Sequence, residues 1–215
     1  MKAGESSLFP LVHDYLKIYL PKQRNVSHNT IRSYRKALEE LLDYVKVCKQ
    51  IPLGEVTFDH LTTDVILSFL EYLEVEKGCS VPTRNTRFAA IRAFMDYAAD
   101  RDLALVSNLN KLKKVPFKKS DIAIAVDYMS MAAITAIIEQ PDASTPKGLR
   151  DQFFMILLYD TGARVQEILN IKLCDLQLGR LPKVTLFGKG RKTRTVPLME
   201  KTVLYLKKYL LSTPI

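Results

Sequence analysis

The feature that most constrains the fold is the helical spacing of apolar residues through the first hundred positions. Between residues 27 and 47, apolar side chains recur along one face of an amphipathic helix, at Ile31, Tyr34, Leu38, Leu41, Leu42 and Val45. Residues 81–99 repeat this long pattern, and residues 9–20 and 63–76 carry shorter versions. Four such helices suffice for a small bundle. We therefore predict a helical domain over residues 1–105.

The second half of the chain mixes two periodicities. Helical patterns occupy residues 130–138, 149–159, 164–171 and 200–211. In the third of these, Val165, Ile168 and Leu169 are expected to point inward. Two β-rich segments, Lys183–Phe187 and Thr193–Pro197, flank a basic stretch with two glycines and predict a hairpin. The expected fold is mainly α with a small antiparallel β-sheet (α+β), in which residues 121–215 form the second domain.

The net positive charge of the chain comes entirely from its second half. Residues 1–105 hold 14 basic and 14 acidic residues, whereas residues 106–215 hold 18 and 9 and carry the whole net charge of +9. A basic field of this kind attracts phosphate backbones or anionic membranes. Because no basic amphipathic stretch has an aromatic apolar face, nucleic acid is the favoured partner and a membrane is not.

Residues 106–120 are predicted to be a basic linker between the two domains. Its lysines are Lys111, Lys113, Lys114, Lys118 and Lys119. One interpretation is a solvated linker that Pro116 and self-repulsion keep extended. A sharper one is a linker that crosses a DNA phosphate backbone, and the two interpretations are compatible.

Cysteine usage and hydropathy indicate the compartment. Cys48, Cys79 and Cys174 lie far apart and include no Cys-x-x-Cys pair, which disfavours a disulfide framework and a structural zinc site. Neither a secretory signal nor a bilayer-spanning apolar run is visible. A cytoplasmic protein without a structural metal site is expected.

Two basic residues stand out by their positions. Arg164 follows a glycine break and opens a helix, with Glu167 three residues later. This spacing suits an ordinary surface ion pair, but arginine can also hold a phosphate through two parallel hydrogen bonds. Lys189 lies between two glycines at the hairpin tip. Most such sequences are simply turns, yet a lysine there could reach a scissile phosphate and donate a proton to its leaving oxygen.

Taken in order, these segments resemble the tyrosine recombinase (phage integrase) family. The likeness is carried by TGARVQEIL at 161–169, by Asp175 with Leu176, and by GKGRKTRTVPL at 188–198. The first half is similar to the family's SAM-like core-binding domain, with TIRSY at 30–34 in the usual place. The likeness runs from about residue 8 to the end of the chain.

The resemblance implies a site-specific recombinase that breaks and rejoins DNA strands through a 3′-phosphotyrosine intermediate. Arg164 would bind the scissile phosphate and stabilise its transition state. Lys189 would be the general acid for the 5′-hydroxyl leaving group. Glu167 would support the structure around the arginine. The resemblance implies no metal and no cofactor, and it implies a bacterial, phage or mobile-element origin.

The resemblance also implies which basic residues contact DNA. The two halves would clamp a duplex, with the helices that carry Arg32 and residues 84–92 facing the major groove. The full set of expected contacts is Arg32, Lys36, Arg84, Arg87, Arg92, Lys111, Lys113, Lys114, Lys118, Lys119, Arg191, Lys192 and Arg194.

Residues 1–215 depart from the family pattern in one respect. The family also uses a His-x-x-Arg box, a later His or Trp and a nucleophilic tyrosine, but this sequence has no histidine after His60 and no arginine after Arg194. Tyr205 and Tyr209 come too soon after the hairpin, in a helix where packing explains them. We therefore expect the last third of a recombinase to be missing and this chain alone to be inactive.

Three hypotheses follow. The first hypothesis is that residues 1–215 are the N-terminal and partial catalytic region of a site-specific recombinase that cuts and rejoins DNA. The complete enzyme would self-associate on DNA. The second is a truncated, catalytically inactive recombinase that acts as a DNA-binding or regulatory protein. The third is an unrelated helical nucleic-acid binder whose motif match is accidental. The exchange of a C-terminal segment between subunits, which the family uses, would not be available to residues 1–215.

Overall fold

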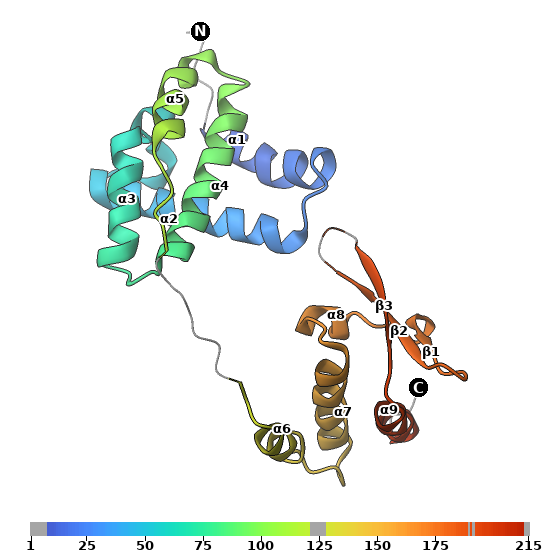
Figure 1. Cartoon of the computed structure of the whole chain (residues 1–215). Coiled ribbons are helices and arrows are strands. Elements are labelled where there is room, and N and C mark those ends of the chain that lie inside the picture. Colours follow the sequence, from blue (N-terminus) through green and yellow to red (C-terminus); the bar gives the residue numbers. More distant parts are fainter. Residues whose placement is uncertain (1–7, 121–127, 189, 191, 213–215) are drawn as a thin grey trace. The chain divides into compact units, whose positions relative to one another are not determined.

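Figure 1 shows the computed structural model, which describes residues 8–120, 128–188, 190 and 192–212. The chain divides into two compact units, Met1–Ala123 and Ile124–Ile215. Each unit has a hydrophobic core of its own. Within the described ranges, no helix is long and apolar enough to cross a membrane. The predicted fold class, mainly α with a small antiparallel sheet, is confirmed.

The first unit is helical throughout. Its helices are α1 (Leu8–Asp14), η1 (Tyr15–Gln23), α2 (His28–Lys49), α3 (Thr63–Val75), α4 (Val81–Ala99) and α5 (Val106–Lys114), with single 3₁₀ turns at Leu53–Glu55, Phe58–His60 and Leu103–Leu105. Side-chain caps fix where two of them begin. The hydroxyl of Ser27 accepts from the Thr30 N–H at 3.3 Å, and that of Thr62 accepts from Val65 at 3.3 Å.

The core of this unit confirms the predicted apolar faces. Leu38, Leu41, Leu42 and Val45 of α2 are buried, and they meet α4, whose buried residues include Phe88, Ile91 and Met95. The expected helix over residues 9–20 differs, because it continues as the π-helix η1, which contains Pro21. Proline has no N–H to donate to the preceding turn, so the regular α-helical ladder is interrupted there.

The predicted linker is wrong over its first nine residues. Residues 106–114 form helix α5, on which Leu109 is 5% exposed and Leu112 fully buried in the core beside α4. Burial of a leucine side chain contributes about 1.5–3 kcal/mol, which outweighs the mutual repulsion of lysines on the solvent side of the helix. The lysines favoured the prediction of an extended linker, although residues 106–114 form an amphipathic helix.

The second unit packs helices against a three-stranded sheet. Its elements are α6 (Met131–Ile138), α7 (Pro146–Thr161), α8 (Val165–Leu169), β1 (Leu176–Gln177), β2 (Lys183–Phe187), β3 (Thr193–Pro197) and α9 (Glu200–Ser212), with a 3₁₀ turn at Leu173–Asp175. The sheet is antiparallel in the order β1-β2-β3, with Val184 paired to Val196. The two hairpin strands lie where the sequence predicted them, and the short β1 was not predicted.

The orientation of α8 differs from the expectation. Only Ile168 of its three predicted inward residues is buried, whereas Val165 is 55% and Leu169 is 62% exposed. The inward face instead carries Glu167 together with Ile168. A five-residue helix has one narrow inward face, so the burial of Glu167 turns its other apolar residues toward solvent.

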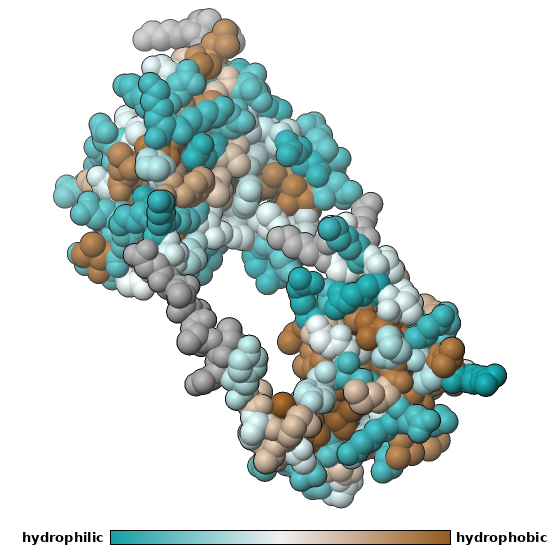
Figure 2. Space-filling model, viewed as in Figure 1, coloured by the Kyte–Doolittle hydropathy of each residue, from teal (hydrophilic) through white to brown (hydrophobic). Residues whose placement is uncertain are grey.

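Exposed apolar residues are prominent on the second unit. Figure 2 shows brown apolar surface there beside teal hydrophilic surface. Among the described residues of this unit, the large apolar ones with more than half of their surface exposed are Tyr128, Met129, Met131, Val165, Leu169, Leu173, Leu181, Phe187, Met199, Leu204 and Leu211. Helix α6 has no buried residue. The described part of the second unit therefore leaves many large apolar side chains exposed to solvent.

Candidate functional site

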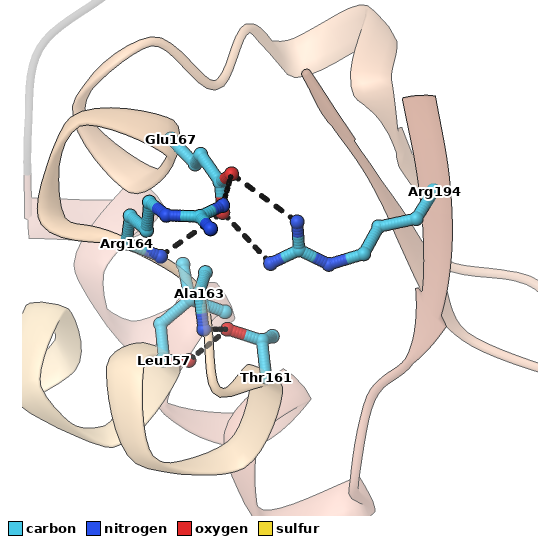
Figure 3. Close-up of polar contacts among 6 residues, drawn as sticks. All are labelled: Leu157, Thr161, Ala163, Arg164, Glu167 and Arg194. Carbon is cyan, nitrogen blue, oxygen red and sulfur yellow. Dashed lines mark hydrogen bonds and ion pairs between the residues drawn. The ribbon is translucent and has the colours of Figure 1, made fainter. Parts of the chain in front are cut away.

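A tight turn places Arg164 at the start of α8. Helix α7 ends at Gly162, whose left-handed φ of 57° is readily adopted only by glycine. The Thr161 hydroxyl donates to the Leu157 carbonyl at 2.6 Å and accepts from the Ala163 N–H at 3.3 Å. These bonds, drawn in Figure 3, fix the chain reversal that leads into Arg164.

Glu167 is the centre of the site. Its carboxylate is buried, with 4% of the side chain exposed, and receives bonds from two arginines (Figure 3). Arg164 donates its backbone N–H to Oε2 at 3.0 Å and its Nη1 to Oε1 at 3.0 Å. Arg194 donates Nη1 to Oε1 at 3.2 Å and Nη2 to Oε2 at 2.7 Å. One carboxylate thus holds two guanidinium groups, and the cluster keeps a net positive charge.

The contacts change the acidity of the carboxylate. Hydrogen bonds from the Arg194 side chain and the Arg164 backbone lower the pKa of Glu167 from 4.5 to about 2, although burial alone would raise it. In turn, the hydrogen bond to Glu167 raises the pKa of Arg194. Glu167 is therefore ionised throughout the physiological pH range.

We expect this carboxylate to make the stability of the second unit depend on acid pH. Because the folded pKa is lowered, the stabilisation is complete above pH 4.5 and is lost as the pH falls from 4.5 toward 2. Urea unfolding of wild type and Glu167→Gln should therefore differ most at pH 6 and converge near pH 2. Glu139→Gln, at an exposed position, is the control. A wild-type advantage that stays constant over this range would contradict the assignment.

The loop between β2 and β3 begins against the same carboxylate. The Gly188 N–H donates to the Lys192 carbonyl at 2.7 Å and closes the loop. A Cβ at position 188 would lie 2.9 Å from Oε1 of Glu167, so a side chain here would press on the carboxylate. The predicted site residues Lys189 and Arg191 lie outside the described residues.

The predicted DNA contacts on α4 are engaged inside the first unit. The Arg84 side chain is 7% exposed, with Nε 3.4 Å from Oε1 of Glu74. Arg87 is 12% exposed and donates Nε to Oε2 of Glu40 at 2.6 Å. Contact with DNA stays a prediction for both arginines, but the structure does not present them as free surface cations. The local sequence gave no signal of these long-range partners.

Arg92 takes part in an anchor for the chain that leaves α5. Its guanidinium lies over the rings of Phe88 and Phe117, at 5.4 and 5.2 Å from their centres. Asn85 donates Nδ2 to the Lys118 carbonyl at 2.8 Å and accepts from the Lys118 N–H at 3.2 Å. The segment around residues 117 and 118 is therefore held against α4. Asn85 and Phe117 were not predicted from the sequence, because their roles depend on tertiary contacts.

The remaining predicted cations divide into two groups. Those with a carboxylate partner are Lys36 with Glu40, Lys113 with Asp96, and Lys118 with Glu74. Exposed cations that have no ion-pair partner in the described part of the chain are Arg32, Lys111, Lys114, Lys119 and Lys192. Arg164 adds a side chain that is 73% exposed despite its bond to Glu167. These six residues are the most available to a phosphate backbone.

Comparison with known proteins assigns the class. The profile of the phage integrase N-terminal SAM-like domain matches residues 13–102, and that of the phage integrase family matches residues 127–213. The chain belongs to the phage integrase family of tyrosine recombinases. This confirms the resemblance seen in the sequence and contradicts the hypothesis of an accidental motif match.

Particular relatives place the chain more closely. It is 37% identical over 192 residues to "Putative integrase/recombinase y4rD" of Sinorhizobium fredii, covering 89% of this chain and 68% of that protein. It is 29% identical over 206 residues to tyrosine recombinase XerD of Staphylococcus epidermidis, covering 93% of this chain and 64% of that protein. The chain thus spans about two thirds of the length of these relatives.

Solved structures agree on the fold. The XerH site-specific recombinase bound to its palindromic difH substrate matches with a TM-score of 0.62 and 17% identity, over 98% of this chain and 62% of that one. The Tn1549 transposon integrase in complex with circular intermediate DNA matches with a TM-score of 0.56 and 18% identity, over 95% and 65%. At this level of identity the likeness concerns the fold.

Proposed function

We propose that this chain is the part of a site-specific DNA recombinase that binds duplex DNA and holds the scissile phosphate through Arg164. The observation that carries the proposal is the guanidinium of Arg164. It is 73% exposed, yet it is fixed at the start of α8 by a buried carboxylate. A preplaced cation beside a second arginine suits the charge that builds on phosphorus during strand transfer.

The proposed chemistry is exchange of one phosphodiester for another. A tyrosine hydroxyl loses its proton to solvent and attacks the scissile phosphorus, forming a 3′-phosphotyrosine bond. The bond from phosphorus to the 5′-oxygen breaks, and this oxygen takes a proton from Lys189. Reversal with a different 5′-hydroxyl rejoins the strands. The proposal uses no metal or cofactor, since side chains supply both charge stabilisation and the proton. The complete recombinase would self-associate on DNA.

DNA binding without strand cleavage is the second candidate for residues 1–215. It is favoured by the packing of the two tyrosines that follow the hairpin. Tyr205 and Tyr209 are partly buried against the core of the second unit, and the Tyr209 ring stacks on Phe153 with centres 5.5 Å apart. Turning either ring toward a phosphate would remove these contacts. The chain would then occupy DNA sites as a binding or regulatory protein.

A DNA-binding measurement tests the role of Arg164. In fluorescence anisotropy with a labelled 40-base-pair duplex, Arg164→Gln should weaken binding by about tenfold or more, because a charge-assisted bond to phosphate is lost. Lys147→Gln, which removes one exposed charge elsewhere in the same unit, is the matched control. Equal affinities of wild type and Arg164→Gln would overturn the assignment of Arg164.

A covalent trap tests whether residues 1–215 cleave DNA by themselves. Wild-type chain is incubated with nicked duplexes that cover candidate recombination sites and is run on a denaturing gel. We expect residues 1–215 to bind these duplexes without a covalent band. A covalent protein–DNA band that mass spectrometry maps to a tyrosine of this chain would exclude binding alone as its function.

A further inference from the structure

The carboxylate of Glu167 joins three segments of the second unit. It bonds to Arg164 on one side and to Arg194 of β3 on the other, and the backbone of Gly188 closes a third side. Figure 3 shows the two guanidinium groups reaching the carboxylate from α8 and from the sheet. The position of this single group therefore depends on strand β3 as well as on the helix that begins after Arg164.

We propose that Arg194 is a positioning residue: it acts on Arg164 through Glu167 and is not itself a contact to DNA. This inference rests on the proposed function of Arg164 as the phosphate-binding group. It differs from the expectation that Arg194 adds a phosphate contact beside the hairpin loop. The assignment follows from how the two arginines use their donors.

The two guanidinium groups are engaged differently. Arg194 gives both Nη atoms to the two carboxylate oxygens, which occupies the Nη1–Nη2 edge, one of the two edges by which a guanidinium can hold a phosphate bidentately. Arg164 gives one side-chain nitrogen, Nη1, and supplies its other bond to Glu167 from the backbone. The Arg164 side chain is 73% exposed and that of Arg194 40%. Among the described residues, Arg164 therefore keeps side-chain donors without a partner, whereas the Nη1–Nη2 edge of Arg194 faces the carboxylate.

Removal of Arg194 should change where Arg164 points. A buried carboxylate must be paired with a cation or with hydrogen-bond donors, and without Arg194 the cation left on it among the described residues is Arg164. Its guanidinium would turn to take both oxygens and withdraw from the phosphate. The carboxylate cannot escape toward the hairpin loop, because Gly188 already lies close to Oε1. Arg194 thus donates to both carboxylate oxygens of Glu167, which leaves the Arg164 guanidinium available to bind a phosphate.

A double-mutant cycle on duplex binding tests this role. Arg164→Gln is expected to weaken binding about tenfold in the wild-type background and less than about threefold in an Arg194→Lys background. Lysine keeps the charge but cannot reproduce the bidentate pair. In the matched control, the effects of Arg164→Gln and Lys192→Gln should multiply. Multiplying effects of Arg164→Gln and Arg194→Lys would overturn the proposal, since independent contacts behave in that way.

A measurement without DNA keeps the two proposals distinguishable. The Nε–Hε NMR signal of Arg164 should shift in Arg194→Lys and in Glu167→Gln, and remain in place in Lys192→Gln. Circular dichroism verifies that each variant is folded. An Arg164 signal unchanged by Arg194→Lys would overturn the positioning role even if DNA binding is confirmed. A shifted signal in a protein that does not bind duplex DNA would support the coupling and contradict the proposed function.

Discussion

The affinity of this chain for duplex DNA should fall by about 10³-fold between 50 and 200 mM salt. Each phosphate that a cation neutralises releases condensed counterions, and about six such contacts produce a loss of this size. Six predicted contacts are exposed and available in the described part of the chain, namely Arg32, Lys111, Lys114, Lys119, Arg164 and Lys192. Anisotropy titrations at five salt concentrations would give the slope of log affinity against log salt.

Two neighbouring lysines on α5 provide a matched comparison for this slope. Lys114 has no ion-pair partner among the described residues, whereas Lys113 lies 2.6 Å from Oδ1 of Asp96. Lys114→Gln should therefore reduce the slope by about one, and Lys113→Gln should reduce it less. An affinity that is flat between low and moderate salt would contradict a DNA-binding function supported by the basic surface.

Replacement of Phe88 by alanine should lower the free energy of unfolding of the first unit by about 3–5 kcal/mol. Phe88 is fully buried, and its ring supports Phe117 at 5.4 Å between ring centres and the guanidinium of Arg92. The variant loses the transfer energy of the ring, leaves a cavity and removes the support of the anchored segment. Urea unfolding followed by far-UV circular dichroism measures the loss.

Phe117→Ala is the control for this effect. Its ring is 47% exposed and packs on the outside of Phe88, so its removal should cost about 1 kcal/mol. It should also release the amide of Lys118 to faster hydrogen exchange, because the segment loses part of its attachment to α4. Equal losses for Phe88→Ala and Phe117→Ala would show that the core does not depend on the buried ring as argued.

The local elements of this protein could be predicted from its sequence. The apolar face of α2, the bounds of β2 and β3, and the break at Gly162 follow from periodicity and turn chemistry within a few residues. Arg164 and Glu167 are three residues apart, within one helical turn, so an ion pair between them could be predicted from the sequence. Each of these features depends on neighbours in the chain.

Tertiary structure decided which basic residues are free. Lys113 and Arg87 look like surface cations in the sequence, but carboxylates 17 and 47 residues away pair with them. Helix α5 formed where lysines suggested an extended linker, because the core of the first unit buries Leu112. Arg194 reached Glu167 across 27 residues, since the hairpin folds back over α8. The sequence determines the charge of each side chain. The carboxylate with which a basic side chain pairs depends on which distant segments pack together around the core.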